Sequence, residues 1–534
     1  MGDFPYSVQA SVQFEFSDSV IACYRLGKCI SSSDEGRMKI WLASFGIALF
    51  AHNAMAQETA EQFHLVGVHE YDAAELLQYA AHYALLDGEI DGQRLAALIG
   101  QVYQEDGYVL ANVTLSSDGK TIVVDEGRVW SVRIEGVDKD VHDLVAKYVA
   151  PLLNDNAVSI DEIERALMLT DDIETVSATT EITYPDPNGD AELRIIGEQL
   201  SDSWGQITID TPGRKPTSAL AATIDQHVYH VATAGDLLKL TFGTSYEFST
   251  KNPSFSGAIS YRAPVGGNGA YIEGYVGTLQ ARYNAMGALQ QTDLNGTTAI
   301  VAVGLPVVRS VDRYGYLIGE IRRASSNATN NAANFKSTAT VGSLIWLDGR
   351  MLDQGGALEY AASLSFGTQS GDTSAATSFN YARFGVGYGH PLTLGDQPAR
   401  IEFQATGQSS SDALPATEKL VLGGRGSNRA YDFNEISGDS GISLSVELAL
   451  EGYNQVTDGI GFEPFGFVDF GWSRSNAFGA TAARSEKSTS LGAGLRFTLP
   501  QNLYGQTYLA VPLVAGPRTA KGDPAIYVSI SKQW

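Results

Sequence analysis

The sequence predicts a mainly β protein: a 16-stranded antiparallel transmembrane β-barrel preceded by two small α+β (β-α-α-β-β) domains. Three observations support this fold class. Apolar and polar residues alternate through the strands of residues 441–534, helical periodicity vanishes after about residue 200, and no apolar run reaches the roughly 20 residues of a membrane-spanning helix. Although 44% of the residues are hydrophobic, the mean hydropathy is only −0.08. A closed barrel reconciles these values, because only half of each strand faces lipid.

The end of the chain shows the alternation most clearly. Three segments carry apolar side chains at every second position: Ile442, Leu444, Val446, Leu448 and Leu450; Leu491, Ala493, Leu495, Phe497 and Leu499; and Ile526, Val528 and Ile530. Period two places one face of each strand in lipid and the other in a water-filled lumen. The chain ends on Trp534, the terminal aromatic residue that we expect to act in membrane insertion.

The first 56 residues are expected to be a leader. Residues 38–56 have the organisation of a secretory signal peptide, with a short basic start, an apolar segment over residues 40–51 and an A-M-A cleavage site at residues 54–56. Residues 1–37 are then a mis-called extension; the alternative is an unusually long leader. Both cysteines, Cys23 and Cys29, precede the cut, so no disulfide or thiol chemistry is expected in the mature protein.

Residues 63–126 are expected to form the first α+β domain. A capping box at Asp72 and Glu75 begins the first of two helices, and Gly107 ends the second. The predicted strands are Phe63–Val68, Tyr108–Leu115 and Thr121–Val124, the last two joined by a turn at Asp118-Gly119.

Residues 127–199 repeat the same order of elements. The first helix ends before Pro151, and Ser159 and Glu162 cap the second. The predicted strands are Val129–Ile134, Val176–Thr183 and Ala191–Ile196. Two copies of one module in series suggest a shared task, and each presents a sheet with an exposed edge.

Residues 200–534 are expected to form the barrel, since about sixteen strands of roughly 10 residues plus turns fill this length. Short turns alternate with longer polar loops, of which Ala328–Asn334 and Asn476–Lys487 are examples. The short turns are predicted near residues 233–236, 266–269, 312–315, 353–356, 395–396, 453–459 and 501–502. An even strand number places both ends of the barrel in the periplasm, beside the two small domains.

Composition and motifs exclude several function classes. The net charge of −25 argues against a nucleic-acid-binding protein, which needs a basic surface. The sequence contains no H-E-x-x-H motif and no P-loop, and none of the eight histidines falls in a predicted extracellular loop. We therefore expect no enzymatic activity, no cofactor and no metal site.

One long loop, between the eleventh strand (Ile401–Thr406) and the twelfth (Ile442–Leu450), carries the candidate site. It contains Gly423, Gly424, Arg429, Ala430, Tyr431, Gly438 and Asp439, and the thirteenth strand carries Phe467, Asp469 and Gly471. Asp469 alternates with lipid-facing residues and must point inward, since a carboxylate in lipid is costly. An inward carboxylate in a confined lumen favours an arginine, which offers a bidentate fork. The alternative for Arg429 is a solvated loop charge.

At these residues the sequence resembles the outer-membrane transporters of two-partner secretion, the hemolysin secretion/activation proteins. In that family an R-G-Y or R-G-F loop tip folds into the lumen, and its arginine pairs with the aspartate of an F-x-D-x-G motif. Arg429 and Asp469 match those positions, whereas Ala430 replaces the usual glycine. The paired α+β domains resemble the family's POTRA domains. Only residues 57–62 separate the expected cut from the first domain, so a pore-plugging helix is expected to be absent.

The resemblance implies a function in the outer membrane of a Gram-negative bacterium. The POTRA domains would capture an unfolded partner exoprotein, of hemolysin or adhesin type, at the edges Tyr108–Leu115 and Val176–Thr183. Further expected partners are outer-membrane lipid and lipopolysaccharide, and periplasmic chaperones and the barrel-assembly machinery for its own insertion. Two alternatives remain: a factor that inserts other barrels into the membrane, and a passive porin.

Overall fold

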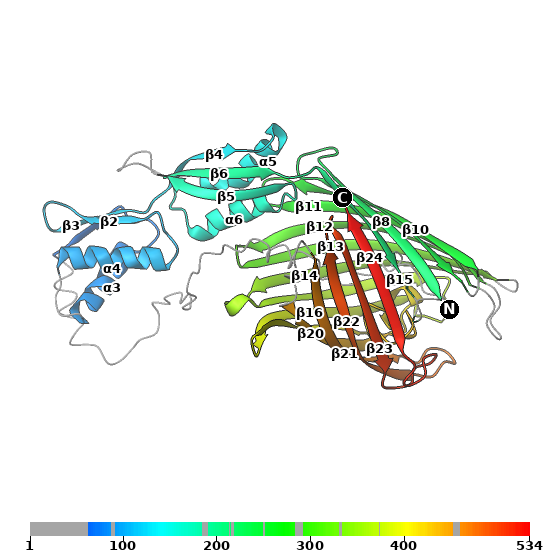
Figure 1. Ribbon diagram of the computed structural model, residues 1–534. Helices are drawn as coiled ribbons and strands as arrows, with labels where there is room; N and C mark the ends of the chain where they lie inside the picture. The colour runs from blue at the N-terminus through cyan, green and yellow to red at the C-terminus, as the bar shows by residue number, and fades with distance from the viewer. Residues whose placement is uncertain are drawn as a thin grey trace.

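The computed structural model describes residues 62–534, except residues 87–90, 184–190, 213, 215–217, 249–250, 284–291, 331–333, 373 and 452–459. Two small α+β units precede a closed antiparallel barrel, and the second unit lies against one end of the barrel (Figure 1). The predicted fold class is therefore confirmed. The leader and the predicted absence of a plug helix fall outside the described residues, and the domain boundaries stay predictions.

The first α+β unit has the predicted order of elements. They are β1 (His64–Val66), α3 (Ala73–Leu86), α4 (Gly92–Glu105), β2 (Asn112–Leu115) and β3 (Thr121–Asp125). The sheet order is β1-β3-β2, and apolar side chains of both helices pack on Ile122 and Val124 of β3. Strand β2 begins four residues later than predicted, because the N–H of Ala111 donates to the carbonyl of Tyr108 and closes a turn there.

The second unit repeats the pattern. Its elements are β4 (Val129–Glu135), α5 (Lys139–Val149), the 3-10 turn η1 (Ala150–Leu152), α6 (Ile160–Asp171), β5 (Val176–Thr183) and β6 (Ala191–Gln199). The capping box of Ser159 and Glu162 is present at the start of α6. The sheet order is β4-β6-β5, so β5 is an edge strand, as β2 is in the first unit.

The two units share buried contacts. Leu110 of the first unit belongs to the apolar core of the second, and the carbonyl of Gly107 accepts a hydrogen bond from the Ile160 N–H at 2.8 Å. Glu126, which follows β3, is buried and accepts bonds from the N–H of His69 (2.8 Å) and the hydroxyl of Tyr103 (2.7 Å). The carboxylate of Glu126 thus ties the connection between the units to the segment before α3 and to α4.

Sixteen strands close the barrel. They are β7 (Ser203–Asp210), β8 (Ala219–Tyr229), β9 (Leu237–Glu247), β10 (Asn252–Val265), β11 (Ala270–Tyr283), β12 (Thr292–Arg309), β13 (Arg313–Asn330), β14 (Asn334–Met351), β15 (Ala357–Ser370), β16 (Ser378–Leu394), β17 (Gln397–Ser409), β20 (Ser440–Leu450), β21 (Gly461–Ser475), β22 (Arg484–Leu499), β23 (Leu503–Pro512) and β24 (Ala525–Gln533). The last strand, β24, pairs antiparallel with the first, β7. The start of β7 and the end of β24 therefore both lie at the end of the barrel that the second unit occupies (Figure 1).

Trp534 extends this closure by one residue. Its N–H and carbonyl exchange hydrogen bonds of 3.0 Å with the carbonyl and N–H of Gly205. The indole lies directly over Gly205, where a Cβ would come within 2.5 Å of the ring. The terminal aromatic residue thus packs on the junction between the first and last strands.

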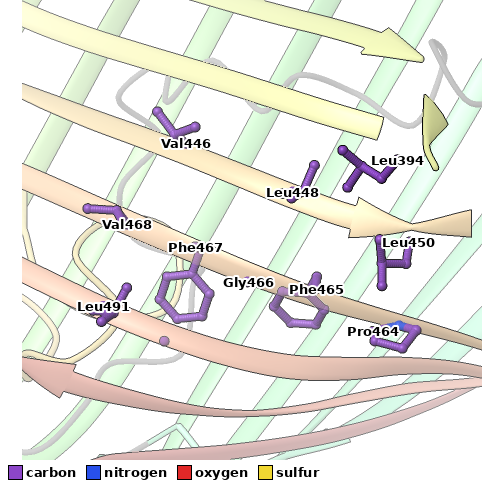
Figure 2. Close-up of a pocket in the computed structure, with 11 residues that line it drawn as sticks. Leu394, Val446, Leu448, Leu450, Pro464, Phe465, Gly466, Phe467, Val468 and Leu491 are labelled. Atoms are coloured by element: carbon purple, nitrogen blue, oxygen red, sulfur yellow. The ribbon is translucent and has the colours of Figure 1, made fainter. Parts of the chain in front are cut away.

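The alternation of the sequence corresponds to the two faces of the barrel wall. Val446, Leu448, Val468 and Leu491 are exposed on the outside, whereas Ser443, Glu447 and Asp469 are buried on the inside. The outward side chains of β20–β22 line one apolar groove with Leu394, and Gly466 lies between Phe465 and Phe467 in its wall (Figure 2). None of the described helices is both long and apolar enough to cross a membrane.

Two polar loops are shorter than predicted. The prediction of a loop over Ala328–Asn334 is wrong at its ends, because β13 and β14 stay paired as far as Thr329 and Asn334. Similarly, β22 begins at Arg484, inside the predicted loop Asn476–Lys487. Ladder hydrogen bonds come from the backbone, so strands with polar side chains can continue beyond the apolar belt.

The second unit is fixed to the barrel by polar contacts. Arg309 lies at the end of β12, and Asp172 follows α6. The Nε of Arg309 donates to both carboxylate oxygens of Asp172, at 2.9 and 3.1 Å. Arg165 of α6 donates to the carbonyl of Pro306 at 2.9 Å. The Thr175 hydroxyl lies 2.6 Å from Nε2 of His230. These contacts place α6 and the segment before β5 beside the ends of β8 and β12.

Glu126→Gln is expected to lower the free energy of unfolding of the first unit by about 1–3 kcal/mol, because it removes the charge from a buried, multiply bonded acceptor. Burial by itself raises the pKa of Glu126, but the bonds from Glu70, His69 and Tyr103 outweigh it, so the pKa lies below its ordinary value of 4.5. The stabilisation is therefore complete above that value and is lost as the pH falls through the lowered pKa.

Hydrogen exchange of the purified protein between neutral and acid pH measures this effect. The exposed Glu105→Gln serves as the control. Equal protection of α3 in wild type and Glu126→Gln at neutral pH would contradict the assignment.

Candidate functional site

The loop between β17 and β20, residues 410–439, folds back into the barrel. Its stem contains the 3-10 turn η3 (Ala416–Glu418) and a hairpin of β18 (Leu420–Leu422) and β19 (Ile436–Gly438). Residues 423–435, here called the lumen tip, lie between the hairpin strands. Side chains of the lumen tip contact the inward faces of β20–β24 and β7.

Arg429 is the best-connected residue of the lumen tip. Its Nε and Nη2 donate to the two oxygens of Asp469 at 3.1 and 2.8 Å, and its backbone N–H donates to Asp469 at 2.9 Å. Nη1 donates to Glu447 at 2.6 Å, and Nη2 also to Ser445 at 3.0 Å. The guanidinium carbon lies 3.3 Å from the ring centroid of Phe467. The fork geometry and the aromatic face suit arginine and not lysine.

Asp469 is buried and uses both of its carboxylate oxygens in this contact. Its side chain is 2% exposed, and Ser445 on β20 and Ser490 on β22, which are its register partners, donate to it at 2.9 and 3.0 Å. A buried carboxylate without a cation costs several kcal/mol. Among the described residues, the cation that compensates this charge is Arg429 of the inward-folded loop.

Gly471 lies two residues further on the same inward face and accommodates Asn428. A Cβ at Gly471 would lie 2.7 Å from Nδ2 of Asn428 and 2.4 Å from Oγ of Ser488. Asn428 is buried, accepts a bond from Ser488 at 2.7 Å and has a positive φ of 52°. The left-handed residue of this stretch is thus Asn428, a residue type that tolerates it, and Ala430 is not among the positive-φ residues.

Ala430 and Tyr431 are buried against the inner wall. They join Phe467 in a cluster with Tyr508 of β23 and Tyr527 of β24. The hydroxyl of Tyr431 lies 2.7 Å from the carbonyl of Val514 and accepts the Thr489 N–H at 3.0 Å. The alanine in place of glycine therefore fills space in a packed cluster.

The remaining predicted residues shape the hairpin. Gly423 has φ of 106°, and a Cβ there would lie 2.2 Å from the Asp432 carbonyl; Gly424 has φ of 92°. Gly438 lets β19 approach the backbone of Arg474 on β21, where a Cβ would lie at 2.9 Å. Asp439 is buried and accepts the N–H groups of Leu414 (2.8 Å) and Asn476 (2.6 Å). Gly423 and Gly424 thus shape the start of the lumen tip, Gly438 and Asp439 hold the stem, and Arg429 to Tyr431 hold the tip against the wall.

The sequence did not indicate a second anchor on another part of the wall. Glu418 of η3 is completely buried. Its carboxylate accepts hydrogen bonds from the guanidinium of Arg322 on β13 at 2.6 and 3.1 Å and from the hydroxyl of Tyr381 on β16 at 2.8 Å. Arg425 of the lumen tip pairs with Asp210 of β7. Inward-facing arginines among alternating strand residues were the available signal, but their loop partners depend on how the strands are staggered.

A closed barrel with an ion-paired loop folded into its lumen and two α+β modules at its periplasmic end defines the class of POTRA-bearing outer-membrane barrels. The family model for Haemolysin secretion/activation protein ShlB/FhaC/HecB matches residues 189–497, which is more than half of the chain. The chain belongs to this family. It is an outer-membrane transporter of two-partner secretion.

Individual relatives are more distant. The Heme/hemopexin transporter protein HuxB of Haemophilus influenzae (strain 86-028NP) is 22% identical over 434 residues, 76% of this chain and 75% of that protein. Among solved structures, CdiB from Escherichia coli superposes with a TM-score of 0.74 over 92% of this chain and all of that chain at 17% identity. CdiB from Acinetobacter baumannii gives 0.69 over 89% of both chains at 18% identity. These structures share the fold.

Gly471→Ala is expected to loosen the lumen tip, because the added methyl group would collide with Asn428 and Ser488. Gly466→Ala is the matched control: it lies on the same strand, and a Cβ there would have only one neighbour, at 3.8 Å. Proteinase K cleavage of the loop in intact cells measures the difference. Faster cleavage is expected only in Gly471→Ala, and equal cleavage of both variants would contradict the assignment.

Proposed function

We propose that this transporter exports one large partner exoprotein of the hemolysin or adhesin type, and that the lumen tip is the gate of its pore. The observation that carries the proposal is the Arg429 guanidinium, held inside the barrel by Asp469 and Glu447. The loop reaches the wall through ion pairs and hydrogen bonds, with a small apolar cluster around Tyr431. Such contacts are strong while dry and weaken when water or a polypeptide enters.

Capture of the exoprotein is assigned to the edge strands of the two α+β units. Strand addition suits an unfolded client, because backbone hydrogen bonds tolerate varied sequence. Strand β5 offers eight residues at the sheet edge, whereas β2 offers four. The second unit also lies nearer the barrel (Figure 1). We therefore assign the main capture edge to Val176–Thr183 and a shorter one to Asn112–Leu115.

Transport on this proposal involves no covalent chemistry by the chain, and folding of the exoprotein outside the cell gives the transport its direction.

The remaining partners follow from the barrel itself. Its outer wall contacts outer-membrane lipid and lipopolysaccharide, and its own insertion uses periplasmic chaperones and the barrel-assembly machinery, with Trp534 at the terminal strand. Loss of many outer-membrane proteins on depletion would favour the barrel-insertion alternative instead.

Arg429→Ala and Asp469→Ala are each expected to reduce exoprotein in the medium by about tenfold, because a tip that cannot dock again after opening no longer completes the transport cycle. Arg429→Ala leaves Asp469 buried without a cation, which costs about 3 kcal/mol or more, and Asp469→Ala removes one of the two carboxylates that pair with Arg429. Arg282→Ala and Asp293→Ala break an exposed arginine–aspartate pair on β11 and β12 and serve as controls. Immunoblots of culture medium against membrane fractions give the ratio. Unchanged secretion by both lumen variants would remove the gating role.

The capture edge is tested with a photo-crosslinking residue at Thr179, which is exposed on β5. A cross-link to the exoprotein during secretion is expected there. The same probe at Asp140, exposed on α5, should give none. Equal yields at the two positions would contradict strand addition at β5.

A further inference from the structure

The inner wall contains the Arg429 contact in a second, similar form. Arg496 of β22 lies with its guanidinium carbon 4.4 Å from the ring centroid of Phe465, two residues before Phe467 on β21. Each phenylalanine faces a glycine across the strand pair, Phe467 opposite Gly492 and Phe465 opposite Gly494. A Cβ at these glycines would lie 2.2 and 2.4 Å from the rings, so the glycines let both rings lie flat as platforms.

Glu447 connects the two arginines. Its Oε2 accepts from Arg429 at 2.6 Å, and its Oε1 accepts from Arg496. On β17, Glu402 lies directly opposite Glu447 in the register. Like charges in facing positions repel, so the Glu447 carboxylate needs its arginines to keep this place. The position of one partner of Arg429 thus depends on Arg496.

The ion pairs continue from Arg496 toward the periplasmic turn. Arg496 donates to the carboxylate of Glu463 at 2.5 Å, and this carboxylate lies 3.7 Å from the guanidinium of Arg400. Arg400 in turn pairs with Glu451 at 3.2 Å and with Glu402 at 2.7 Å. The side chains of Asp469, Glu447 and Arg429 are only 2%, 8% and 12% exposed, whereas the side chains from Arg496 onward are 15–33% exposed. The buried end holds the lumen tip, and the wet end faces the mouth beside the α+β units.

We infer that Arg496 is a positioning residue for the gate. It fixes Glu447, and through Glu447 it holds Arg429, so that the contacts at the periplasmic mouth set how firmly the lumen tip is docked. An extended polypeptide entering at the mouth meets Arg400, Glu463 and Arg496 first. Its charged groups compete for these partners, release Glu447 and weaken the hold on Arg429 before the polypeptide reaches the tip. This inference rests on the proposed gating by Arg429.

A double-mutant cycle in planar lipid bilayers tests it with the full protein. The variants are Arg496→Gln, Arg496→Lys, Arg429→Ala and Arg429→Ala/Arg496→Gln, with heat-modifiable migration on gels as the check that each barrel is folded. Arg496→Gln is expected to raise the open probability by about fivefold, as for coupled members of one ion-pair network. Arg496→Lys should raise the open probability less, since lysine keeps the charge of arginine but not its fork of donors. Arg262→Gln breaks an inward pair with Glu273 on β10 and β11, and should leave the open probability unchanged.

The decisive result is the comparison between the effect of Arg496→Gln in the wild-type background and its effect in the Arg429→Ala background. Arg496→Gln should add little or nothing to Arg429→Ala, because its effect passes through Glu447 to Arg429. Equal effects of Arg496→Gln in both backgrounds, or none in the wild-type background while Arg429→Ala opens the pore, would overturn this inference and leave the gate itself standing. No opening by Arg429→Ala would instead remove the gate.

Discussion

A single buried carboxylate sets the organisation of the lumen. Asp469 faces inward because the other face of β21 meets lipid, and its two register neighbours are serines, which cannot neutralise it. The compensating cation has to come from outside the local strands, and the loop that brings Arg429 supplies it. The glycine at 471, the left-handed Asn428 and the flat ring of Phe467 each make room for that approach.

On the proposed function, the loop acts both as a cover of the pore and as a sensor of the entering polypeptide. Its stem is fixed at Glu418 to β13 and β16, while its tip is fixed to β20–β24 and β7, so it touches the wall in widely separated places. The stem contact is the drier of the two, because Glu418 and Arg322 are almost completely buried. A tip that detaches around a fixed stem would clear the lumen without unfolding the loop.

Much of the fold was predictable from periodicity. Strict alternation fixed which side of β20–β24 meets lipid, and the same argument placed Asp469 inside. Contacts that depend on strand tilt and stagger were not predictable, because no local pattern reports them: Glu447 with Arg496 spans two ladders, and Glu418 with Arg322 joins a loop to a remote strand. Strand ends were also poorly predicted, at Tyr108 and at Ala328, since backbone pairing and not side-chain polarity decides them.

The central claim is that the lumen tip has to leave the wall for polypeptide to pass. The described chain contains no cysteine, so a single cross-link can be placed between Asn428→Cys and Ser488→Cys, whose native side chains are 2.7 Å apart. Secretion measured with this disulfide formed and then reduced tests the claim directly. We expect export to stop when the tip is locked and to resume on reduction; export at the normal rate with the cross-link complete would contradict the account.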